Sequence, residues 1–356
     1  MGGLSGARVL VAPLDWGLGH AARCVPVIRR LCARGAVPVL AADHGPLALL
    51  RGEFPGLEQV RLPGITVRYA VGRSQLWSLA MQFPAMLRSV ATERTTLERI
   101  APGLRLDAVV SDQRFGVRSD RLPSVLLTHQ LFPPAPLARL PLQRLNLRHV
   151  ARFDRCWVLD EPVAPGLAGE LSHGPRVPAN VRYIGPVSRL TEPAGTAARA
   201  HRIVAVISGP EPQRTLLEDI LLDQLATLPG EHLLVQGLPH RPDRRRVGHV
   251  DVVGHLPGRA LREALLGASL IVSRSGYTTL MDLAALGLGA LIIPTPGQPE
   301  QEYLGRLHAR TGRFVVQDQH SVDLARVLAA PPARYPASYD PALLDAALDE
   351  LDGMLR

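Results

Sequence analysis

Short apolar runs rich in branched residues recur along the whole chain and alternate with longer segments whose apolar positions have helical spacing. In the first half these runs are RVLVAP, VPVLAA, DAVVS, SVLLT and CWVLD; in the second half they are RIVAVIS, HLLVQ, DVVG, SLIVS and ALIIP. Buried strands that alternate with helices are typical of βαβ units, which build parallel sheets. The pattern therefore predicts an α/β protein with parallel sheets.

The 356-residue chain is long enough for two domains of roughly 150 residues each. A stretch rich in Pro, Gly, Ala and Thr, GPVSRLTEPAGTAARAH, separates the two series of predicted strands. We expect two Rossmann-like domains that face each other across a cleft, with ligands at the carboxyl ends of the strands. The predicted divisions are residues 1–186 for the first domain, 187–200 for a linker, 201–335 for the second domain and 336–356 for a C-terminal helix. This helix is expected to pack back toward the first domain, and Asp340 and Pro341 supply its cap and first turn.

All 40 Lys+Arg residues of the chain are arginine. The lack of lysine excludes chemistry that needs an amine, such as a Walker-type phosphate loop or a Schiff-base cofactor. The net charge of +8 favours anionic partners such as phosphates or a membrane face, although compositional drift toward arginine would produce the same surplus. The 3 cysteines form no C-x-x-C pair and no cluster with histidine. We therefore expect reduced thiols, no metal and a cytoplasmic protein.

Residues 1–7 lack the features of a signal peptide, and the apolar stretch from Leu76 is too short to span a bilayer. The spacing in RLPLQRLNLRHVARFDR predicts a basic helix, which can rest on an anionic membrane or simply be solvated above a packed stripe. Four arginines share one arc of this predicted helix: Arg144, Arg148, Arg152 and Arg155. The segment 240–249 is predicted to be a charged surface loop. Nucleic acid is not an expected partner, because few aromatic residues accompany the arginines.

The segment LDWGLGHAARC places two glycines and a histidine between a predicted strand and a predicted helix. Gly17 and Gly19 allow a tight turn and the close approach of a ligand. The free N–H groups at the start of the helix suit a phosphate or another polar substrate. His20 lies at that helix start and is expected to face the crevice. A turn with a purely structural histidine is the simpler alternative.

A further alternative treats the same turn as a dinucleotide fingerprint. Gly17, Gly19 and Ala22 satisfy G-x-G-x-x-A, and Asp43 ends the next strand about 20 residues further on. That pattern would define an oxidoreductase dependent on NAD(P) or a flavin. Asp15 and Trp16, which intervene between the strand and the first glycine, count against it, as does the bulk of His20 near a pyrophosphate.

LDAVVSDQRFG places Asp112 just past a predicted strand. If that strand neighbours the first one, Asp112 emerges beside His20, where a carboxylate would orient the imidazole and raise its basicity. The alternative is that Asp112 caps the following loop. His129 ends another strand and is expected either to line the same crevice or to be a satisfied loop histidine.

The passage SLIVSRSGYTTLMDL leads from a strand through Arg274, Ser275 and Gly276 into a helix. Gly276 lets the chain turn, and the helix start supplies N–H donors that serine and threonine hydroxyls can supplement. Asp282 lies one turn into this helix, where its carboxylate could accept both hydroxyls of a ribose. Capping of the helix is the alternative for Asp282.

The second half resembles the nucleotide-sugar domain of GT-B glycosyltransferases, especially glycosyltransferase family 28 and MurG-like enzymes. In that family a strand, S-R-x-G, a helix bearing an acid, a strand ending in Pro and a loop containing Gln bind a UDP-sugar. The corresponding segments here are SLIVSRSG, the helix with Asp282, ALIIP and the loop PTPGQPEQ. The N-terminal turn ending in Gly19 and His20 is similar to the family as well, so the resemblance spans most of the chain.

The resemblance implies a role for each matching position. The residues at or near the donor pyrophosphate are Arg274, Ser275, Gly276 and Thr278. Asp282 replaces the Glu that holds the ribose, and Leu256 matches the backbone position that reads the base. The loop that contacts the sugar is matched by Glu300 and Gln301. The segment ISGPEPQR replaces the glycine-rich loop of the family. It is expected to contact the donor through Ser208, Gly209 and Arg214.

We therefore expect a GT-B fold and the transfer of a sugar from a UDP-sugar to an acceptor hydroxyl, inverting and metal-independent, with no cofactor. His20, oriented by Asp112, is the expected catalytic base. The expected acceptor-binding residues are Gly17, Gly19, Gln113 and His129. The resemblance also implies a lipid-linked acceptor and peripheral contact with an anionic membrane. The alternatives are a nucleotide-sugar hydrolase or epimerase on the same fold, the oxidoreductase described above, and an adaptor without catalysis.

Overall fold

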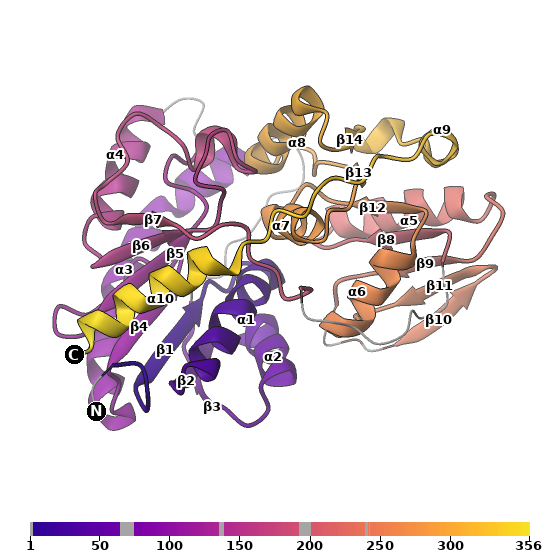
Figure 1. The fold of residues 1–356 in the computed structure, drawn as a ribbon. Helices are drawn as coiled ribbons and strands as arrows, with labels where there is room; N and C mark the ends of the chain where they lie inside the picture. Colours follow the sequence, from indigo (N-terminus) through magenta and orange to yellow (C-terminus); the bar gives the residue numbers. More distant parts are fainter. Residues whose placement is uncertain (1–2, 65–74, 135–138, 192–200, 239–240, 242) are drawn as a thin grey trace. The chain divides into compact units, whose positions relative to one another are not determined.

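The computed structural model describes residues 3–64, 75–134, 139–191, 201–238, 241 and 243–356, with the side chains of 75–87 and 139 outside the description. The chain divides into two compact units. The first unit is built mainly from Met1–Arg68, Trp77–Val187 and Asp340–Arg356, and the second mainly from Ser188–Tyr339. Each unit has its own sheet (Figure 1).

The sheet of the first unit has seven parallel strands in the order β3-β2-β1-β4-β5-β6-β7. These strands are β1 (Arg8–Pro13), β2 (Val37–Ala42), β3 (Glu58–Arg61), β4 (Ala108–Asp112), β5 (Ser124–Thr128), β6 (Arg155–Val158) and β7 (Val181–Tyr183). The helical segments are α1 (Leu18–Ala33), α2 (His44–Glu53), α3 (Gln75–Leu104), α4 (Arg139–Val150), η1 (Gly169–Leu171) and α10 (Pro341–Met354). Strands β4 and β5 are buried at every residue, as expected where helices cover both faces of a parallel sheet.

The C-terminal helix α10 belongs to the first unit, as predicted. The carboxylate of Asp340 accepts a hydrogen bond from the Ala342 N–H at 2.9 Å and so caps the helix. Its buried stripe consists of Leu344, Ala347, Leu348 and Leu351. Arg30 of α1 pairs with Asp345 at 3.0 Å, and Arg182 of β7 donates to Glu350 at 2.7 Å. Figure 1 shows α10 lying beside α1 along the sheet.

The sheet of the second unit also has seven strands, in the order β10-β11-β9-β8-β12-β13-β14. They are β8 (Ile203–Val206), β9 (His232–Val235), β10 (Arg244–Val247), β11 (Val250–Val253), β12 (Leu270–Ser273), β13 (Leu291–Ile292) and β14 (Val315–Val316). All neighbours are parallel except the edge strand β10, which is antiparallel to β11. The helical segments are α5 (Gln213–Leu225), α6 (Gly258–Gly267), α7 (Tyr277–Ala285), α8 (Pro299–Thr311), η2 (Gln319–Ser321) and α9 (Leu324–Ala329).

The predicted α/β class with two Rossmann-like sheets is confirmed, and each of the ten apolar runs forms a strand. In each unit the chain first adds strands toward one edge of the sheet and then toward the other, and the switch lies between β1 and β4 in the first unit and between β8 and β12 in the second. Ligands of open α/β sheets bind outside the carboxyl ends of the strands at such a reversal. The two reversal points are therefore where the candidate site residues must be sought.

Two local predictions are wrong. Segment 240–249 is not wholly a loop, because residues 244–247 pair with β11 as an exposed edge strand whose arginines contact Asp251, Glu218 and Glu231. Charged side chains on an edge strand discourage pairing with another chain. The basic helix is shorter than predicted: α4 ends at Val150, Arg152 lies in the following turn and Arg155 begins β6. The four arginines therefore do not share a helical face.

Candidate active site

His20 and Asp112 meet at the strand reversal of the first unit. His20 lies in the first turn of α1, which follows β1, and Asp112 is the last residue of β4. The parallel register sets Asp112 opposite Pro13, the last residue of β1. The Nδ1 atom of His20 is 3.0 Å from Oδ2 of Asp112. The Asp112 side chain is fully buried, whereas the His20 side chain is 20% exposed, so the imidazole is the part of the pair that a ligand can reach.

Arg23 is part of the same cluster, although the sequence analysis did not single it out. Its buried guanidinium donates from Nε to Oδ2 of Asp112 at 2.9 Å and from Nη2 to Oδ1 of the same carboxylate. Burial alone would raise the pKa of Asp112, but the charges and hydrogen bonds of Arg23 and His20 outweigh burial and lower it. Asp112 is therefore held as a carboxylate. The available signal was an arginine inside the apolar helical run AARCVPVI, three residues after His20.

The predicted acceptor-binding residues are distributed around this cluster. The Nδ1 atom of buried His129 is 2.9 Å from Nη1 of Arg23; since a guanidinium only donates, His129 accepts there. Gln113 has a positive φ of 57° and donates from Nε2 to the Thr128 hydroxyl at 2.6 Å. Gly17 is exposed and immediately precedes α1, whereas Gly19 lies inside the helix and does not form the turn. No side chain caps this helix start.

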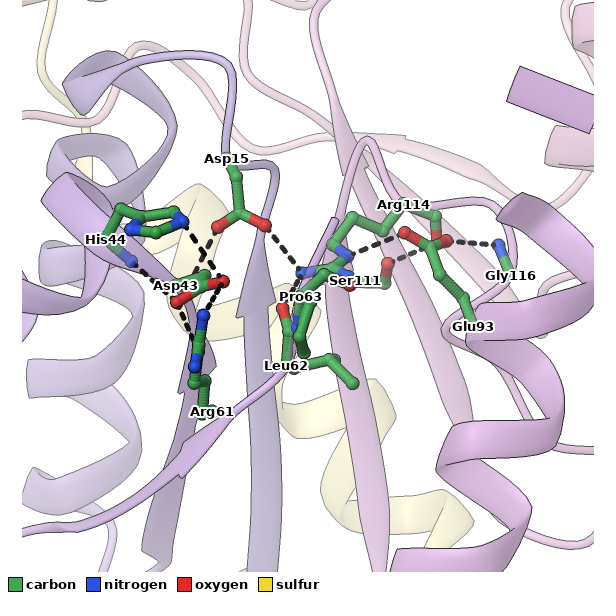
Figure 2. A network of polar contacts seen from close by, with 10 residues as sticks. All are labelled: Asp15, Asp43, His44, Arg61, Leu62, Pro63, Glu93, Ser111, Arg114 and Gly116. Carbon is green, nitrogen blue, oxygen red and sulfur yellow. Dashed lines mark hydrogen bonds and ion pairs between the residues drawn. The ribbon is translucent and has the colours of Figure 1, made fainter. Parts of the chain in front are cut away.

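A second polar network surrounds Arg114 and includes Asp15 of the β1–α1 turn (Figure 2). Arg114, whose side chain is fully buried, donates from Nε to Glu93 of α3 at 2.9 Å and from Nη1 to Asp15 at 3.3 Å. It also donates to the carbonyl oxygens of Leu62 and Pro63, at 3.0 and 2.9 Å. Burial raises the pKa values of Asp15 and Glu93, and Arg114 opposes that shift. The network ties the turn that carries Asp15 to α3 and to the end of β3.

Asp43, the acid of the dinucleotide fingerprint, forms hydrogen bonds with neighbouring residues of the first unit. It caps α2 by accepting the His44 N–H at 3.0 Å and accepts Nε of Arg61 at 2.8 Å (Figure 2). The hydrogen bond from Arg61 lowers the pKa of Asp43. Its backbone N–H donates to Asp15 at 3.0 Å. Asp43 therefore acts as a helix cap and as the ion-pair partner of Arg61, and these roles account for its presence without a bound ribose.

In the second unit, β12 leads through Arg274, Ser275 and Gly276 into α7. No side chain caps α7, and a Cβ atom added at Gly276 would meet nothing within 4 Å. The buried Ser275 hydroxyl donates to the backbone carbonyl of Gln301 at 2.9 Å. This bond connects the start of α7 to α8, while Oε1 of Gln301 accepts from the backbone and hydroxyl of Thr295 at 3.0 and 2.9 Å.

Arg274 is buried beneath the start of α7. Its Nη2 atom donates to the carbonyl of Gln213 and to Oε1 of Gln319, both at 2.7 Å, and Nη1 donates to the carbonyl of Pro294 at 3.3 Å. Burial lowers the pKa of Arg274 to about 10. The side chain therefore fixes the loop after β13 and the start of α5 around the β12–α7 turn.

Asp282 lies one turn into α7 and accepts a hydrogen bond from the Ser188 hydroxyl at 2.5 Å. Burial is the largest influence on this carboxyl and raises its pKa to about 6, against the opposing effects of Ser188 and Arg189. Ser188 begins the main segment of the second unit, Ser188–Tyr339, and is itself buried. Residues 188–190 of the predicted linker are therefore packed in place, whereas residues 192–200 lie outside the described part of the chain.

The remaining predicted donor residues differ in accessibility. Ser208 and Gly209 are exposed just after β8, and Gly209 has a positive φ of 129°. Arg214 is buried in α5 and donates to Glu211 and Glu218 at 2.7 and 2.6 Å. Partly exposed positions are held by Leu256, Thr278 and Glu300. Within the described ranges, no three or more His, Cys, Asp or Glu side chains are grouped so as to hold a metal ion.

Comparisons with known proteins concern the fold and part of the second unit. Residues 259–326 match the glycosyltransferase family 28 C-terminal domain. The solved spinosyn rhamnosyltransferase SpnG is 19% identical, with a TM-score of 0.62 over 98% of this chain and 96% of that chain. The glycotransferase of kitacinnamycin is 19% identical, with a TM-score of 0.61 over 99% and 95%. The glycosyltransferase SsfS6 of Streptomyces sp. SF2575, complexed with thymidine diphosphate, is 17% identical, with a TM-score of 0.58 over 98% and 96%.

A search of curated proteins found no match. The structural matches show the GT-B fold, and residues 259–326 of the second unit are similar to the family 28 C-terminal domain. The chain is therefore a glycosyltransferase, as the sequence predicted. The comparisons give no support to the oxidoreductase, hydrolase or epimerase alternatives. Over the described residues, no helix has the length and apolar character needed to span a bilayer.

Proposed function

We propose that this enzyme transfers a sugar from a UDP-sugar to an acceptor hydroxyl, with inversion at the anomeric carbon and without a metal ion. The contact of His20 with Asp112 at the strand reversal carries this proposal. An imidazole paired with a carboxylate is suited to remove a proton from an attacking hydroxyl. The partial exposure of His20 leaves it open to such a substrate.

In the proposed reaction, the acceptor oxygen bonds to the anomeric carbon while the bond from that carbon to the diphosphate breaks. The Nε2 atom of His20 takes the hydroxyl proton, and Asp112 stabilises the resulting imidazolium through Nδ1–H. The nucleoside diphosphate leaves with the bonding electron pair. The predicted acceptor residues around this base are Gly17, Gly19, Gln113 and His129.

The donor is assigned to the second unit. The start of α7 at Gly276, where no side chain caps the helix and a Cβ atom would meet open space, suits a diphosphate because a helix N-terminus presents N–H groups and the positive end of the helix dipole. Charge accumulates on the departing diphosphate, so donors aimed at it lower the barrier. Additional donor contacts are assigned to Ser208, Gly209, Arg214, Arg274, Ser275, Thr278, Glu300 and Gln301. Asp282 is assigned to the ribose hydroxyls and Leu256 to the base.

The acceptor is proposed to be a lipid-linked molecule. The enzyme is proposed to be cytoplasmic and to bind this acceptor at an anionic membrane surface. The excess of arginine supports this choice, since basic surfaces are attracted to anionic lipids. UDP is the proposed nucleotide, and dTDP is its natural competitor because the similar SsfS6 was solved with thymidine diphosphate. Both carry a pyrimidine base on a diphosphate.

Thermal unfolding with UDP, UDP-sugars, dTDP, dTDP-sugars and NAD tests the donor assignment. Stabilisation by UDP and its sugars is expected, growing with the logarithm of ligand concentration. Stabilisation by NAD alone would overturn the transferase assignment, and a preference for dTDP would replace the nucleotide. NMR of the anomeric proton of the product tests inversion, and activity that survives EDTA tests metal independence. Release of free sugar into water without any acceptor product would contradict transfer.

A further inference from the structure

A cavity of about 470 Å³ lies within the first unit and takes no part in the candidate active site. It is lined by residues 118–123, which precede β5, by Arg152 and Asp154, which precede β6, and by Met354 of α10. Both strands run parallel to β4, whose last residue is Asp112. The cavity therefore lies at the amino ends of the strands, at the opposite end of the sheet from Asp112.

Three arginines line this cavity, and two of them are available to a ligand. Arg121 and Arg152 are exposed, and among the residues that the structure describes their guanidinium groups have no acceptor. Arg118, whose side chain is 13% exposed, is held in place because its Nη1 atom donates to Asp120 at 2.7 Å and to the Arg152 carbonyl at 3.4 Å. A guanidinium can only donate hydrogen bonds. The cavity therefore suits a ligand that offers several acceptor oxygens.

The two aspartates of the lining do not cancel this positive charge. Asp120 lies between Arg118 and Arg94 of α3, and hydrogen bonds from both arginines lower its pKa. Its carboxylate is therefore ionised and already paired. Asp154 accepts the backbone N–H at the start of β5 at 2.8 Å. The unpaired guanidinium groups thus remain the dominant charges that a ligand meets.

His149 near the end of α4 is influenced by the same positive charge. Its pKa is lowered first by burial and then by the charges of Arg152 and Arg118. A nearby cation disfavours the charged form of an imidazole. Two of the three lining arginines therefore lie close enough together to act on one neighbour.

The remaining lining suits the rest of a phosphorylated molecule. The Ser119 hydroxyl accepts the Arg121 N–H at 3.1 Å and keeps its own proton to donate. Leu122, Pro123 and Met354 supply apolar surface. Arginine guanidinium and hydroxyl groups are typical partners of phosphate oxygens, and small-molecule sites have volumes of roughly 300–1,000 Å³. Both the chemistry and the volume favour a phosphate carried on a carbon skeleton.

We propose that this cavity binds a phosphate monoester, with the phosphate recognised by Arg118, Arg121 and Arg152 and the carbon part in contact with Met354. Such a group belongs both to soluble phosphorylated metabolites and to the headgroup of an anionic lipid such as phosphatidic acid. The inference gives the first unit a second ligand site. It does not rest on the proposed function, because none of these residues is assigned to the donor or the acceptor.

The methyl group of Met354, one of the 5 methionines of the chain, provides a local signal for the test. Protein labelled at its methionine methyl groups is titrated with butyl phosphate and followed by NMR, and the signal is assigned with Met354→Leu. We expect a saturable shift of the Met354 signal. Butanol, the same carbon chain without the phosphate, should not produce it. An unmoved signal, or an equal response to butanol, would overturn the proposal.

Two double variants with the same loss of charge locate the binding. Arg121→Gln/Arg152→Gln removes the two unpaired guanidinium groups, and we expect the affinity for butyl phosphate to fall about 10-fold or more. The control is Arg310→Gln/Arg326→Gln, which removes two exposed arginines of the second unit and should leave the affinity unchanged. Equal losses in the two variants would show only a general attraction of anions to a basic protein and would refute the site.

Vesicle sedimentation distinguishes the two sources of the phosphate group. Vesicles of phosphatidylcholine that contain phosphatidic acid are compared with vesicles of phosphatidylcholine alone. If the lipid headgroup is the ligand, Arg121→Gln/Arg152→Gln binds the phosphatidic acid vesicles more weakly than the control variant does. If the two variants bind them alike while butyl phosphate moves the Met354 signal, the ligand is a soluble phosphate ester. None of these measurements uses a sugar donor, so a failure of the proposed function would leave their result unaffected.

Discussion

Asp112 lies directly opposite Pro13 in the parallel pairing of β4 with β1. Because the chain leaves β1 at Pro13 and enters α1 five residues later at Leu18, this register brings the carboxylate of Asp112 to the first turn of α1. His20 and Arg23, one helical turn apart, then both reach it. The pair therefore depends on the neighbouring positions of two strands that are far apart in the sequence.

His20→Ala should abolish the base while leaving the donor-binding residues of the second unit unchanged. We expect the turnover rate to fall about 100- to 10,000-fold, as is typical for loss of a general base, with the affinity for UDP near the wild-type value. Steady-state kinetics and calorimetric titration of UDP measure the two quantities. The exposed His320 provides the control, His320→Ala, which should change neither. A large loss of UDP affinity in His20→Ala would show that the histidine has been assigned to the wrong substrate.

Gly276→Val should separate ligand binding from folding. A Cβ atom at Gly276 meets nothing within 4 Å and the backbone φ is −68°, so the fold accepts a side chain there. If a diphosphate approaches the start of α7, the added side chain obstructs it, and we expect UDP affinity to fall at least about 10-fold. Gly56→Val is the matched control, since Gly56 is exposed with equally open surroundings. Unchanged UDP affinity in Gly276→Val would exclude this helix start as the diphosphate site.

Asp282→Asn should alter how stability depends on pH. Burial raises the pKa of Asp282 from 3.8 to about 6 in the folded protein, so the folded state holds this proton more tightly than the unfolded state does. Its contribution to stability is therefore greatest below about pH 4 and is lost as the pH rises through 6. We expect Asp282→Asn to gain melting temperature relative to wild type at pH 8 and to gain less at pH 4. Identical pH profiles for the two proteins would mean that this carboxyl is not perturbed.

The same variant tests the proposed ribose contact. Asparagine can still accept from Ser188 through its amide oxygen, but it accepts less strongly from ribose hydroxyls than a carboxylate does. We expect UDP affinity to fall in Asp282→Asn, and the wild-type affinity to weaken as the pH is lowered through 6. Full UDP affinity in the variant would leave Asp282 with only its contact to Ser188.

Arg114→Met should reveal how much the network in Figure 2 contributes to the free energy of unfolding. The substitution leaves Asp15 and Glu93 as buried carboxylates without their cation, which typically costs about 3–5 kcal/mol of unfolding free energy. Since burial already raises both pKa values, ionising these groups becomes still less favourable, and the loss should be larger at pH 8 than at pH 5. Urea denaturation at the two pH values measures it.

The control for that experiment is Arg94→Met. Arg94 also pairs with two carboxylates, Glu98 and Asp120, but its side chain is 38% exposed, and exposed pairs contribute about 0–1 kcal/mol. We expect a small loss with little dependence on pH. A comparable loss in both variants would argue that the Arg114 network is no more important than a surface ion pair.

The strands that the sequence predicted best are those buried on both faces. RVLVAP, SVLLT and SLIVS are short apolar runs rich in branched residues, which is typical of a covered parallel strand. The strands that it missed are short and lie at or near sheet edges, such as EQVR in β3 and RRRV in β10. Their hydrogen bonds come from a neighbouring strand, and their own side chains carry little sign of it.

The chemistry-bearing residues divide in the same way. Asp112 ends a strand, and His20 and the segment around Gly276 come just after strands, so their position at a sheet end could be predicted from local sequence. The role of Arg23 could not be predicted in this way, because a charged residue within an apolar helix can be interpreted only when its partner, here Asp112, is known.

The sequence by itself determined the alternation of strands and helices, the division into two Rossmann-like halves and the placement of polar residues after the strands, since burial and backbone preference are local in the chain. Only the tertiary structure decided which strand ends meet. Asp112 lies 92 residues from His20 and 89 from Arg23, and the order β3-β2-β1-β4 is what makes them neighbours. A buried carboxylate needs hydrogen-bond donors. The order of the strands in the folded sheet determines which donors lie within reach of Asp112.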